Sequence, residues 1–141
     1  MNLYLDTSSV IKLCIFEPGS QSVLEAVNEA TVVSTSPAAY AETRAALARL
    51  RREGALTASL FAAAKREFEE QWPAYLTVEV TSALCRTAGD LAEKYGLRGF
   101  DSIHLASFAE IASHGGVDNA RFSSFDRRLN KAAGNLLRRL H

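Results

Sequence analysis

The chain has 141 residues, and its 16 basic and 16 acidic side chains give a formal net charge of zero. This length predicts one compact domain, residues 1–141, and an apolar content of 48% is enough for an ordinary core. The balanced charge argues against a protein that coats nucleic acid by bulk charge. Neither a basic leader nor an apolar run of about 20 residues is present, so we expect a cytoplasmic protein without a membrane segment.

The two cysteines, Cys14 and Cys85, are far apart and belong to no CxxC pair. Both lie in apolar segments, which predicts two buried free thiols in a reducing compartment rather than a disulfide. The chain also lacks the clustered cysteine and histidine ligands that zinc prefers.

In the N-terminal half, short apolar segments alternate with helical ones. Ser36 and Pro37 favour a clean helix start, since serine caps helices and proline suits the first helical position. Gly54 favours the end of that helix. The elements predicted in chain order are a strand over 1–5, helices over 9–16 and 20–30, a strand over 31–34, and helices over 37–53 and 57–71.

The C-terminal half continues the alternation. Residues 101–113 are apolar nearly all round, which is typical of a helix buried on more than one side. The predicted elements are a strand over 76–80, helices over 81–95 and 101–113, a strand over 120–125, a helix over 126–133 and a last strand over 135–140. This order predicts an α/β fold with three α/β/α layers and a mainly parallel sheet of about five strands.

Four acids from distant segments are predicted to face one edge of this sheet. Asp6 and Asp126 follow strands, Asp101 is at the start of the buried helix, and Glu42 lies five residues after Pro37. In open parallel sheets the functional crevice lies outside the carboxyl ends of the strands. Simpler interpretations stay open, because each aspartate suits a helix cap and a glutamate is usually a surface residue.

Converging carboxylates repel one another, and a hard divalent cation relieves that repulsion. Mg²⁺ and Mn²⁺ both favour oxygen ligands. If the site occupies four of the 16 acids, 16 − 4 = 12 acids remain against 16 basic residues, which leaves a mildly basic surface. The residues therefore predict a metal site that suits a phosphate-containing substrate, with Asp6, Glu42, Asp101 and Asp126 as ligands.

Four stretches make the sequence similar to a known family. They are Leu5-Asp6-Thr7-Ser8 with Lys12 and Glu17-Pro18-Gly19 after it, Glu42-Thr43-Arg44-Ala45-Ala46-Leu47, Gly99-Phe100-Asp101-Ser102-Ile103-His104-Leu105-Ala106, and Ser124-Phe125-Asp126-Arg127-Arg128-Leu129. In their order and spread over almost the whole chain, they resemble the PIN-domain family, particularly the toxin ribonucleases of VapBC toxin–antitoxin pairs.

The resemblance implies a single PIN-like nuclease domain and a Mg²⁺- or Mn²⁺-dependent endoribonuclease. It implies that Asp6 and Asp101 bind the principal metal, that Asp126 and Glu42 complete the site, and that a metal-activated water attacks RNA phosphodiesters. It also implies a cognate antitoxin that occupies the site, and a homodimer. Where the family often has threonine, this chain has Ser124, which keeps the hydroxyl group but puts one hydrogen bond beside the site in doubt.

Several basic residues and one histidine are secondary candidates. His104 lies three residues after Asp101 and either packs in the buried helix or touches substrate or metal-bound water. Arg44 is either solvated or contacts phosphate or antitoxin. The cations at 49, 51 and 52 suit a helix end, with RNA contact as the alternative. Arg127 and Arg128 flank the proposed site and are better phosphate-binding candidates.

Two other functions compete with the nuclease. One is a catalytically idle module of the same fold, which acts only through an antitoxin or RNA; four retained acids argue against it. The other is a phosphotransfer or phosphatase domain with Asp6 as nucleophile. Such nucleophiles commonly have a second acid two residues on, where this chain has Ser8.

Overall fold

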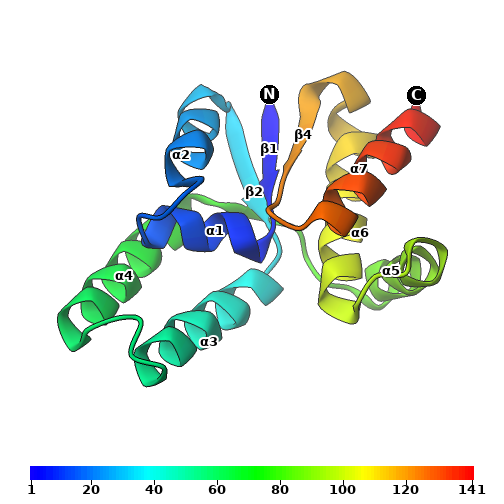
Figure 1. The fold of residues 1–141 in the computed structure, drawn as a ribbon. Coiled ribbons are helices and arrows are strands. Elements are labelled where there is room, and N and C mark those ends of the chain that lie inside the picture. The colour runs from blue at the N-terminus through cyan, green and yellow to red at the C-terminus, as the bar shows by residue number, and fades with distance from the viewer.

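The computed structural model describes residues 1–141 and contains a four-stranded, fully parallel sheet in the order β3-β2-β1-β4 (Figure 1). The strands are β1 (Asn2–Leu5), β2 (Val32–Thr35), β3 (Leu76–Thr77) and β4 (Ala120–Ser123). In the central strand, Leu3 lies opposite Val33 on one side and Arg121 on the other. Because the strands are parallel, their carboxyl ends meet at one edge, the lower edge in Figure 1.

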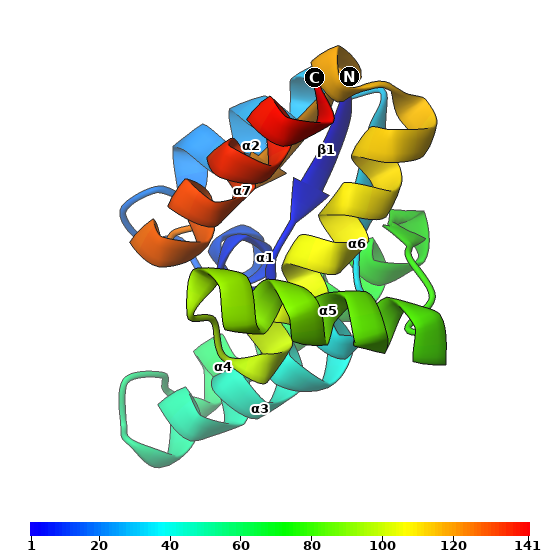
Figure 2. The same ribbon diagram turned by 90° about the vertical axis from the view of Figure 1, so that its right-hand side faces the viewer.

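Helices cover both faces of the sheet, which confirms the three-layer α/β/α prediction (Figures 1 and 2). The helices are α1 (Thr7–Cys14), α2 (Ser20–Glu29), α3 (Ala38–Arg52), α4 (Ala58–Gln71), α5 (Ser82–Tyr95), α6 (Gly99–Gly115) and α7 (Arg127–Leu140). Two short 3₁₀ turns, η1 (Trp72–Ala74) and η2 (Val117–Asn119), precede β3 and β4.

Alternate side chains of β1 divide the core into two halves, as expected for a strand buried on both faces. Tyr4 packs with Leu105 and Phe108 of α6 and with Leu129 of α7. Leu3 and Leu5 pack on the opposite face with residues of α1, α2 and α4. The central strand therefore fixes where its last residue, and the acid after it, emerge from the core.

The predicted fifth strand, residues 135–140, was wrong, because these residues continue α7 to Leu140. The buried positions Leu129, Ala132, Ala133 and Leu136 recur at helical spacing on one face, and Gly134 does not interrupt them. The predicted strand 76–80 is also shorter, since only Leu76 and Thr77 pair with β2. In both segments a strand forms only where the backbone pairs with a neighbouring strand, whatever the β propensity of the residues.

The predicted helix starts are confirmed to within one or two residues. The Ser36 hydroxyl accepts from the amide of Ala38 at 3.1 Å, beside Pro37, which is the N-cap residue of α3 and makes no side-chain cap. Thr57 and Thr81 cap α4 and α5, since each hydroxyl accepts from the amide three residues on. These local hydroxyl groups satisfy backbone donors that a helix leaves unpaired.

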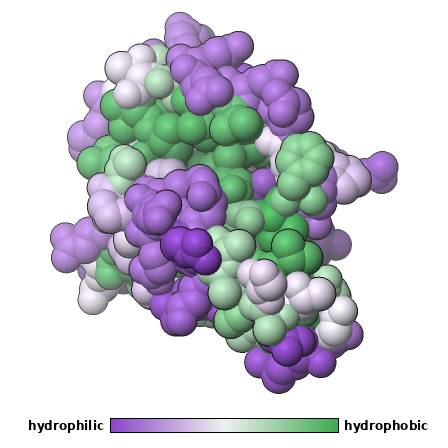
Figure 3. Space-filling view, turned by 90° about the vertical axis from the view of Figure 1, so that its left-hand side faces the viewer, coloured by the Kyte–Doolittle hydropathy of each residue, from purple (hydrophilic) through white to green (hydrophobic).

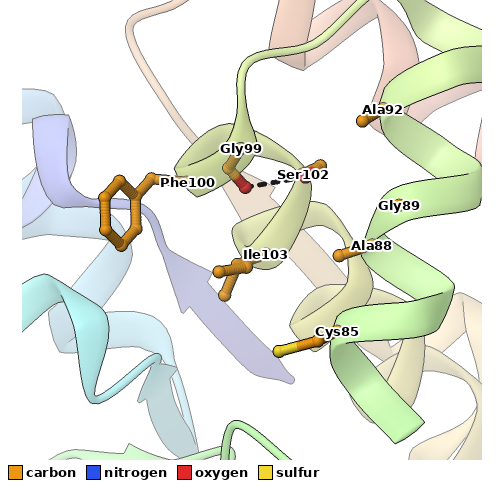
Figure 4. A pocket seen from close by; sticks show the side chains of 8 residues that line it. All are labelled: Cys85, Ala88, Gly89, Ala92, Gly99, Phe100, Ser102 and Ile103. Atoms are coloured by element: carbon orange, nitrogen blue, oxygen red, sulfur yellow. Dashed lines mark hydrogen bonds between the residues drawn. The ribbon is translucent and has the colours of Figure 1, made fainter. Parts of the chain in front are cut away.

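Both cysteines are free, as predicted, but only one is shielded from solvent. Burial raises the pKa of the half-buried Cys14 thiol to about 12. Cys85 is exposed, so its predicted burial was wrong. It lines a groove between α5 and α6, where the small residues Ala88, Gly89 and Ala92 leave space beside Ile103 (Figure 4).

One side of the molecule carries a second apolar groove, of about 420 Å³, between α2 and the β2–β3 edge. Apolar side chains gather in the upper part of this face (Figure 3). Leu24, Val32 and Leu76 line the groove and are all exposed. None of the helices combines the length and apolar character that crossing a membrane requires.

Candidate active site

The four acids predicted from sequence all lie on segments that leave the carboxyl edge of the sheet. Asp6 directly follows β1, and Asp126 follows β4 after two residues. Glu42 lies in the second turn of α3, which begins just after β2, and Asp101 lies in the first turn of α6. Figure 1 shows the starts of α1, α3, α6 and α7 together at this edge.

Asp6 is 4% exposed, and hydrogen bonds hold both of its carboxylate oxygens. Oδ1 accepts from the Ser8 hydroxyl at 2.6 Å and from the Ser9 amide at 3.0 Å. Oδ2 accepts from the Ser124 hydroxyl at 2.6 Å. The helix-cap interpretation of Asp6 is therefore correct, and the hydrogen bond that serine at 124 put in doubt is present.

The same hydroxyl groups join α1 to the segment between β4 and α7. The Ser8 hydroxyl accepts from the amide of Phe125 at 2.9 Å. The Ser9 and Ser123 hydroxyls lie 2.8 Å apart, and the Asp6 amide donates to the Ser123 carbonyl at 3.1 Å. Sequence reasoning did not find this role, for which consecutive hydroxyl residues after a strand-ending acid were the signal.

Asp126 caps α7, since its Oδ1 accepts from the Leu129 amide at 2.9 Å. Its own amide donates to the Ser124 hydroxyl at 3.0 Å, so Ser124 contacts both Asp6 and Asp126. The other carboxylate oxygen of Asp126 accepts no hydrogen bond from the protein. Asp126 therefore holds its helix and still presents an unpaired oxygen.

Asp101 is not a helix cap, which corrects one of the open interpretations. α6 begins at Gly99 with Arg98 as its N-cap residue, so Asp101 lies inside the first turn. Figure 4 shows Ser102 donating to the Gly99 carbonyl, while Phe100 points away from α5. Asp101 and Asp126 line one pocket of about 330 Å³ together with Arg98 and Arg128.

The electrostatic surroundings of Asp101 are those of a crowded carboxylate. Burial and the negative charge of Asp126 raise its pKa, and Asp6 adds to the increase. Arg98, whose mostly exposed guanidinium lies 3.6 Å away, and His104 oppose the increase. Three of the predicted acids therefore influence one another through space.

Glu42 belongs to a second hydrogen-bonded group, built around the buried His104. The Thr7 hydroxyl donates to Glu42 Oε1 at 2.6 Å, and His104 Nε2 lies 3.1 Å from the same oxygen. Tyr4 Oη lies 2.8 Å from His104 Nδ1. Burial alone raises the pKa of Glu42, but the hydrogen bonds from His104 and Thr7 outweigh it and lower the pKa overall. Glu42 is thus held as an ionised acceptor.

The packing interpretation of His104 is confirmed, and its contact with substrate or metal-bound water stays a prediction. The side chain is packed and hydrogen-bonded inside α6, at 2% exposure, and it also contacts a predicted site acid. Sequence reasoning missed its partners Tyr4 and Thr7, because nothing local connects residues that lie about a hundred positions apart.

Other candidate residues divide into structural and site-facing ones. Arg44 forms an ion pair with Glu69 of α4 at 2.8 Å and so holds two helices together. Lys12 forms an ion pair with Glu17 at 3.0 Å. Arg49 and Arg52 share a pocket of about 440 Å³ with Thr7 and Glu42, so the basic end of α3 faces this part of the site.

The donor set fits a hard divalent cation in its chemistry. Although no three acidic, histidine or cysteine side chains are close enough together to hold one ion, Mg²⁺ does not require three. Mg²⁺ is usually held by one or two carboxylates, keeps several waters and takes its remaining ligands from substrate phosphate. The pocket shared by Asp101 and Asp126, with Asp6 nearby, supplies that number of carboxylates.

Comparisons with known proteins agree with the geometry. The PIN domain family matches residues 3–135. Ribonuclease VapC45 and Ribonuclease VapC49, from two strains of Mycobacterium tuberculosis, are each 37% identical over 131 residues, which cover 93% of this chain and 88% of theirs. A crystal structure, PAE2754 from Pyrobaculum aerophilum, superposes with a TM-score of 0.67 at 20% identity over 99% of this chain and 89% of that one, which shows a shared fold. The chain therefore belongs to the PIN domain family and, within it, to the VapC-type proteins.

Proposed function

We propose that this protein is a divalent-cation-dependent endoribonuclease and the toxin of a type II toxin–antitoxin pair. The names of the two VapC relatives support ribonuclease activity. The observation that carries the metal-dependent part is the pocket that Asp101 shares with Asp126 and two arginines, where burial and the charges of Asp126 and Asp6 raise the pKa of Asp101. Such crowding favours either a shared proton or a bound cation.

In the proposed reaction, water attacks the phosphorus of an RNA phosphodiester, the P–O bond to the leaving nucleotide breaks, and the leaving oxygen takes up a proton in place of the one that the water loses. A divalent cation held by Asp6 and Asp101, with Asp126 and Glu42 acting through its bound waters, would lower the pKa of water and offset phosphate charge. Asp6 and Asp126 are oriented by their hydrogen bonds to Ser124 and the backbone. Glu42, ionised because its pKa is lowered, accepts hydrogen bonds and orients water.

The proposal includes a cognate antitoxin, a homodimer and a cytoplasmic setting. The apolar grooves of Figures 3 and 4 support protein partners, because contiguous exposed apolar surface commonly marks interaction sites. Two free cysteines support a reducing compartment.

The test compares wild-type protein with Asp101→Asn on end-labelled structured RNA, in Mg²⁺, in Mn²⁺ and in EDTA. Asp90→Asn is the matched control, because Asp90 is exposed on α5 and belongs to no ion pair. We expect cleavage by wild type and control only with a cation, and a loss of at least about 100-fold in Asp101→Asn, as when a charge-stabilising group is removed.

Three results would contradict the proposal. Cleavage that persists in EDTA would exclude a cation requirement. RNA binding without cleavage in either cation would support the idle module. A covalent phosphoryl group on Asp6 would support phosphotransfer, although Asp6 is buried and both of its oxygens already accept hydrogen bonds.

A further inference from the structure

A cleft between the C-terminal end of α5 and the N-terminal half of α7 is lined mostly by basic and polar residues. Its volume is about 450 Å³, and four of its seven lining residues are cations: Lys94, Arg127, Arg128 and Lys131. Tyr95 and Asn135 also line it, whereas no acidic residue does. Figure 2 shows these two helix segments beside each other. We refer to this surface as the basic cleft.

The four cations of the basic cleft are not used to hold the fold together by ion pairs. None of them forms a salt bridge, and all four are exposed. Glu93 is adjacent to Lys94 in sequence but does not line the cleft. Like charges gathered in a concave surface repel one another and focus a positive potential outward, which attracts an anionic ligand.

The basic cleft is continuous with the carboxylate site through Arg128. This residue lines the cleft and also the pocket that contains Asp101 and Asp126. Its Nη1 donates to the Gly96 carbonyl at 3.0 Å, which fixes the guanidinium at the boundary between the two. A polyanion whose scissile phosphate lies at the carboxylates would therefore extend directly into the cleft.

We propose that the basic cleft binds the phosphate backbone of single-stranded RNA that extends from the cleavage site. This inference rests on the proposed ribonuclease function and adds the path of the substrate. Arg127 and Lys131 lie one turn apart on α7 and contact successive phosphates, while Arg128 contacts the phosphate nearest the site.

The composition of the cleft favours RNA over an acidic protein segment. Protein interfaces usually centre on buried apolar or aromatic anchors, and this cleft offers only Tyr95 and Ala132 as apolar lining. Phosphate contacts require cations and polar groups, which predominate here. The apolar grooves of Figures 3 and 4 lie on other parts of the surface.

The test measures RNA binding in EDTA, where the proposed reaction does not proceed. Fluorescence anisotropy with a labelled single-stranded oligoribonucleotide is recorded over a salt series for wild type and for Arg127→Gln/Lys131→Gln. The matched control is Lys65→Gln/Arg66→Gln, which removes one lysine and one arginine from α4, where neither forms an ion pair. Thermal unfolding establishes that all three proteins are folded.

We expect the cleft variant to bind at least about tenfold more weakly, and its salt dependence to lose about 1.4 in log–log slope for two lost phosphate contacts. The control should stay within about twofold of wild type, since it has the same net charge as the cleft variant but an intact cleft. Photo-crosslinking of thiouridine-containing RNA should label peptides of α7 and the end of α5.

Cleavage kinetics separate this inference from the proposed function. If RNA is cleaved, the cleft variant should raise KM for long RNA and leave kcat within about twofold, because uniform binding is lost. Cleavage with an unchanged KM, or equal weakening in the control, would overturn the cleft assignment while the ribonuclease stands. Binding through the cleft without cleavage would support the cleft assignment and contradict the proposed ribonuclease function. Loss of binding to an acidic peptide but not to RNA would assign the cleft to a protein partner.

Discussion

His104 Nε2 lies 3.1 Å from Oε1 of Glu42, and this contact joins the core of the protein to its carboxylate site. An ionised carboxylate accepts hydrogen bonds but cannot donate them, so the proton in this contact belongs to Nε2. In the neutral ring, Nδ1 then accepts from the Tyr4 hydroxyl at 2.8 Å. Burial raises the pKa of Tyr4, which keeps that hydroxyl protonated. Tyr4 of β1 thus orients His104 of α6, and His104 orients Glu42.

Replacing His104 should disturb the site more than the fold. We expect His104→Asn to reduce cleavage about 10- to 100-fold and to weaken Mn²⁺ binding, because residues that orient metal ligands have effects of this size. Mn²⁺ binding measured by electron paramagnetic resonance gives a readout independent of activity. The control is His114→Asn on the same helix, where the ring is mostly exposed. Equal effects of both substitutions would contradict the role of His104.

The Ser124 hydroxyl donates to Asp6 and accepts from the Asp126 amide. Its removal should therefore leave both acids less well oriented. We expect Ser124→Ala to lower the free energy of unfolding by about 1–3 kcal/mol and cleavage by about tenfold. Ser124→Thr keeps a hydroxyl and should restore most of both. Denaturant titration and initial rates measure the two effects, and Ser113→Ala, an exposed position on α6, is the control. A threonine variant as impaired as the alanine variant would contradict the hydrogen-bond explanation.

The contributions of Asp101 and Glu42 to the stability of the protein should change with pH in opposite directions when EDTA removes metal ions. Because the pKa of Asp101 is raised by folding, its contribution to stability is fully present below its unfolded-state pKa and is lost as pH rises through the folded value. Asp101→Asn should therefore raise the melting temperature at neutral pH, and the difference should vanish near pH 3, below the ordinary aspartate value of about 3.9. Melting curves across this range test the sign, with Asp90→Asn as control.

Glu42 should show the reverse dependence. Its pKa is lowered in the folded protein, so its contribution is present above the unfolded-state pKa and is lost as pH falls through the folded value. Glu42→Gln should lower the melting temperature at neutral pH, by an amount that shrinks below about pH 4.3. The same melting curves apply, and a stabilised Glu42→Gln at neutral pH would mean that His104 and Thr7 do not offset its burial.

The turn before α2 requires glycine for two reasons. Gly19 has a φ of +97°, and a Cβ atom there would lie 2.5 Å from Cε1 of Phe125. We expect Gly19→Ala to lower the free energy of unfolding by about 1–3 kcal/mol through backbone strain and this clash. Adding Phe125→Ala should recover only the part due to the clash. Gly89→Ala on α5, where a Cβ meets nothing within 4 Å, should be neutral or stabilising by up to about 1 kcal/mol. Equal losses at both glycines would contradict this account.

Local patterns in the sequence were sufficient for most of the fold. Alternating strand and helix segments predicted the parallel three-layer sheet, and the Ser36-Pro37 pair predicted the start of α3. The error at residues 135–140 arose because a segment of six residues, three of them leucine, suits a strand as well as the end of a helix. Exposure of Cys85 was also missed, because burial depends on which helix face has a neighbour.

The sequence by itself determined which acids follow the strands, because strand ends and helix starts are local features of the chain. Only the tertiary structure decided what those acids contact: Ser124 on Asp6, His104 on Glu42, and Asp126 beside Asp101. It also brought Lys94 and Lys131 into one cleft. Such pairings join residues far apart in the chain, and the packing of whole helices against the sheet fixes them, so no local spacing records them.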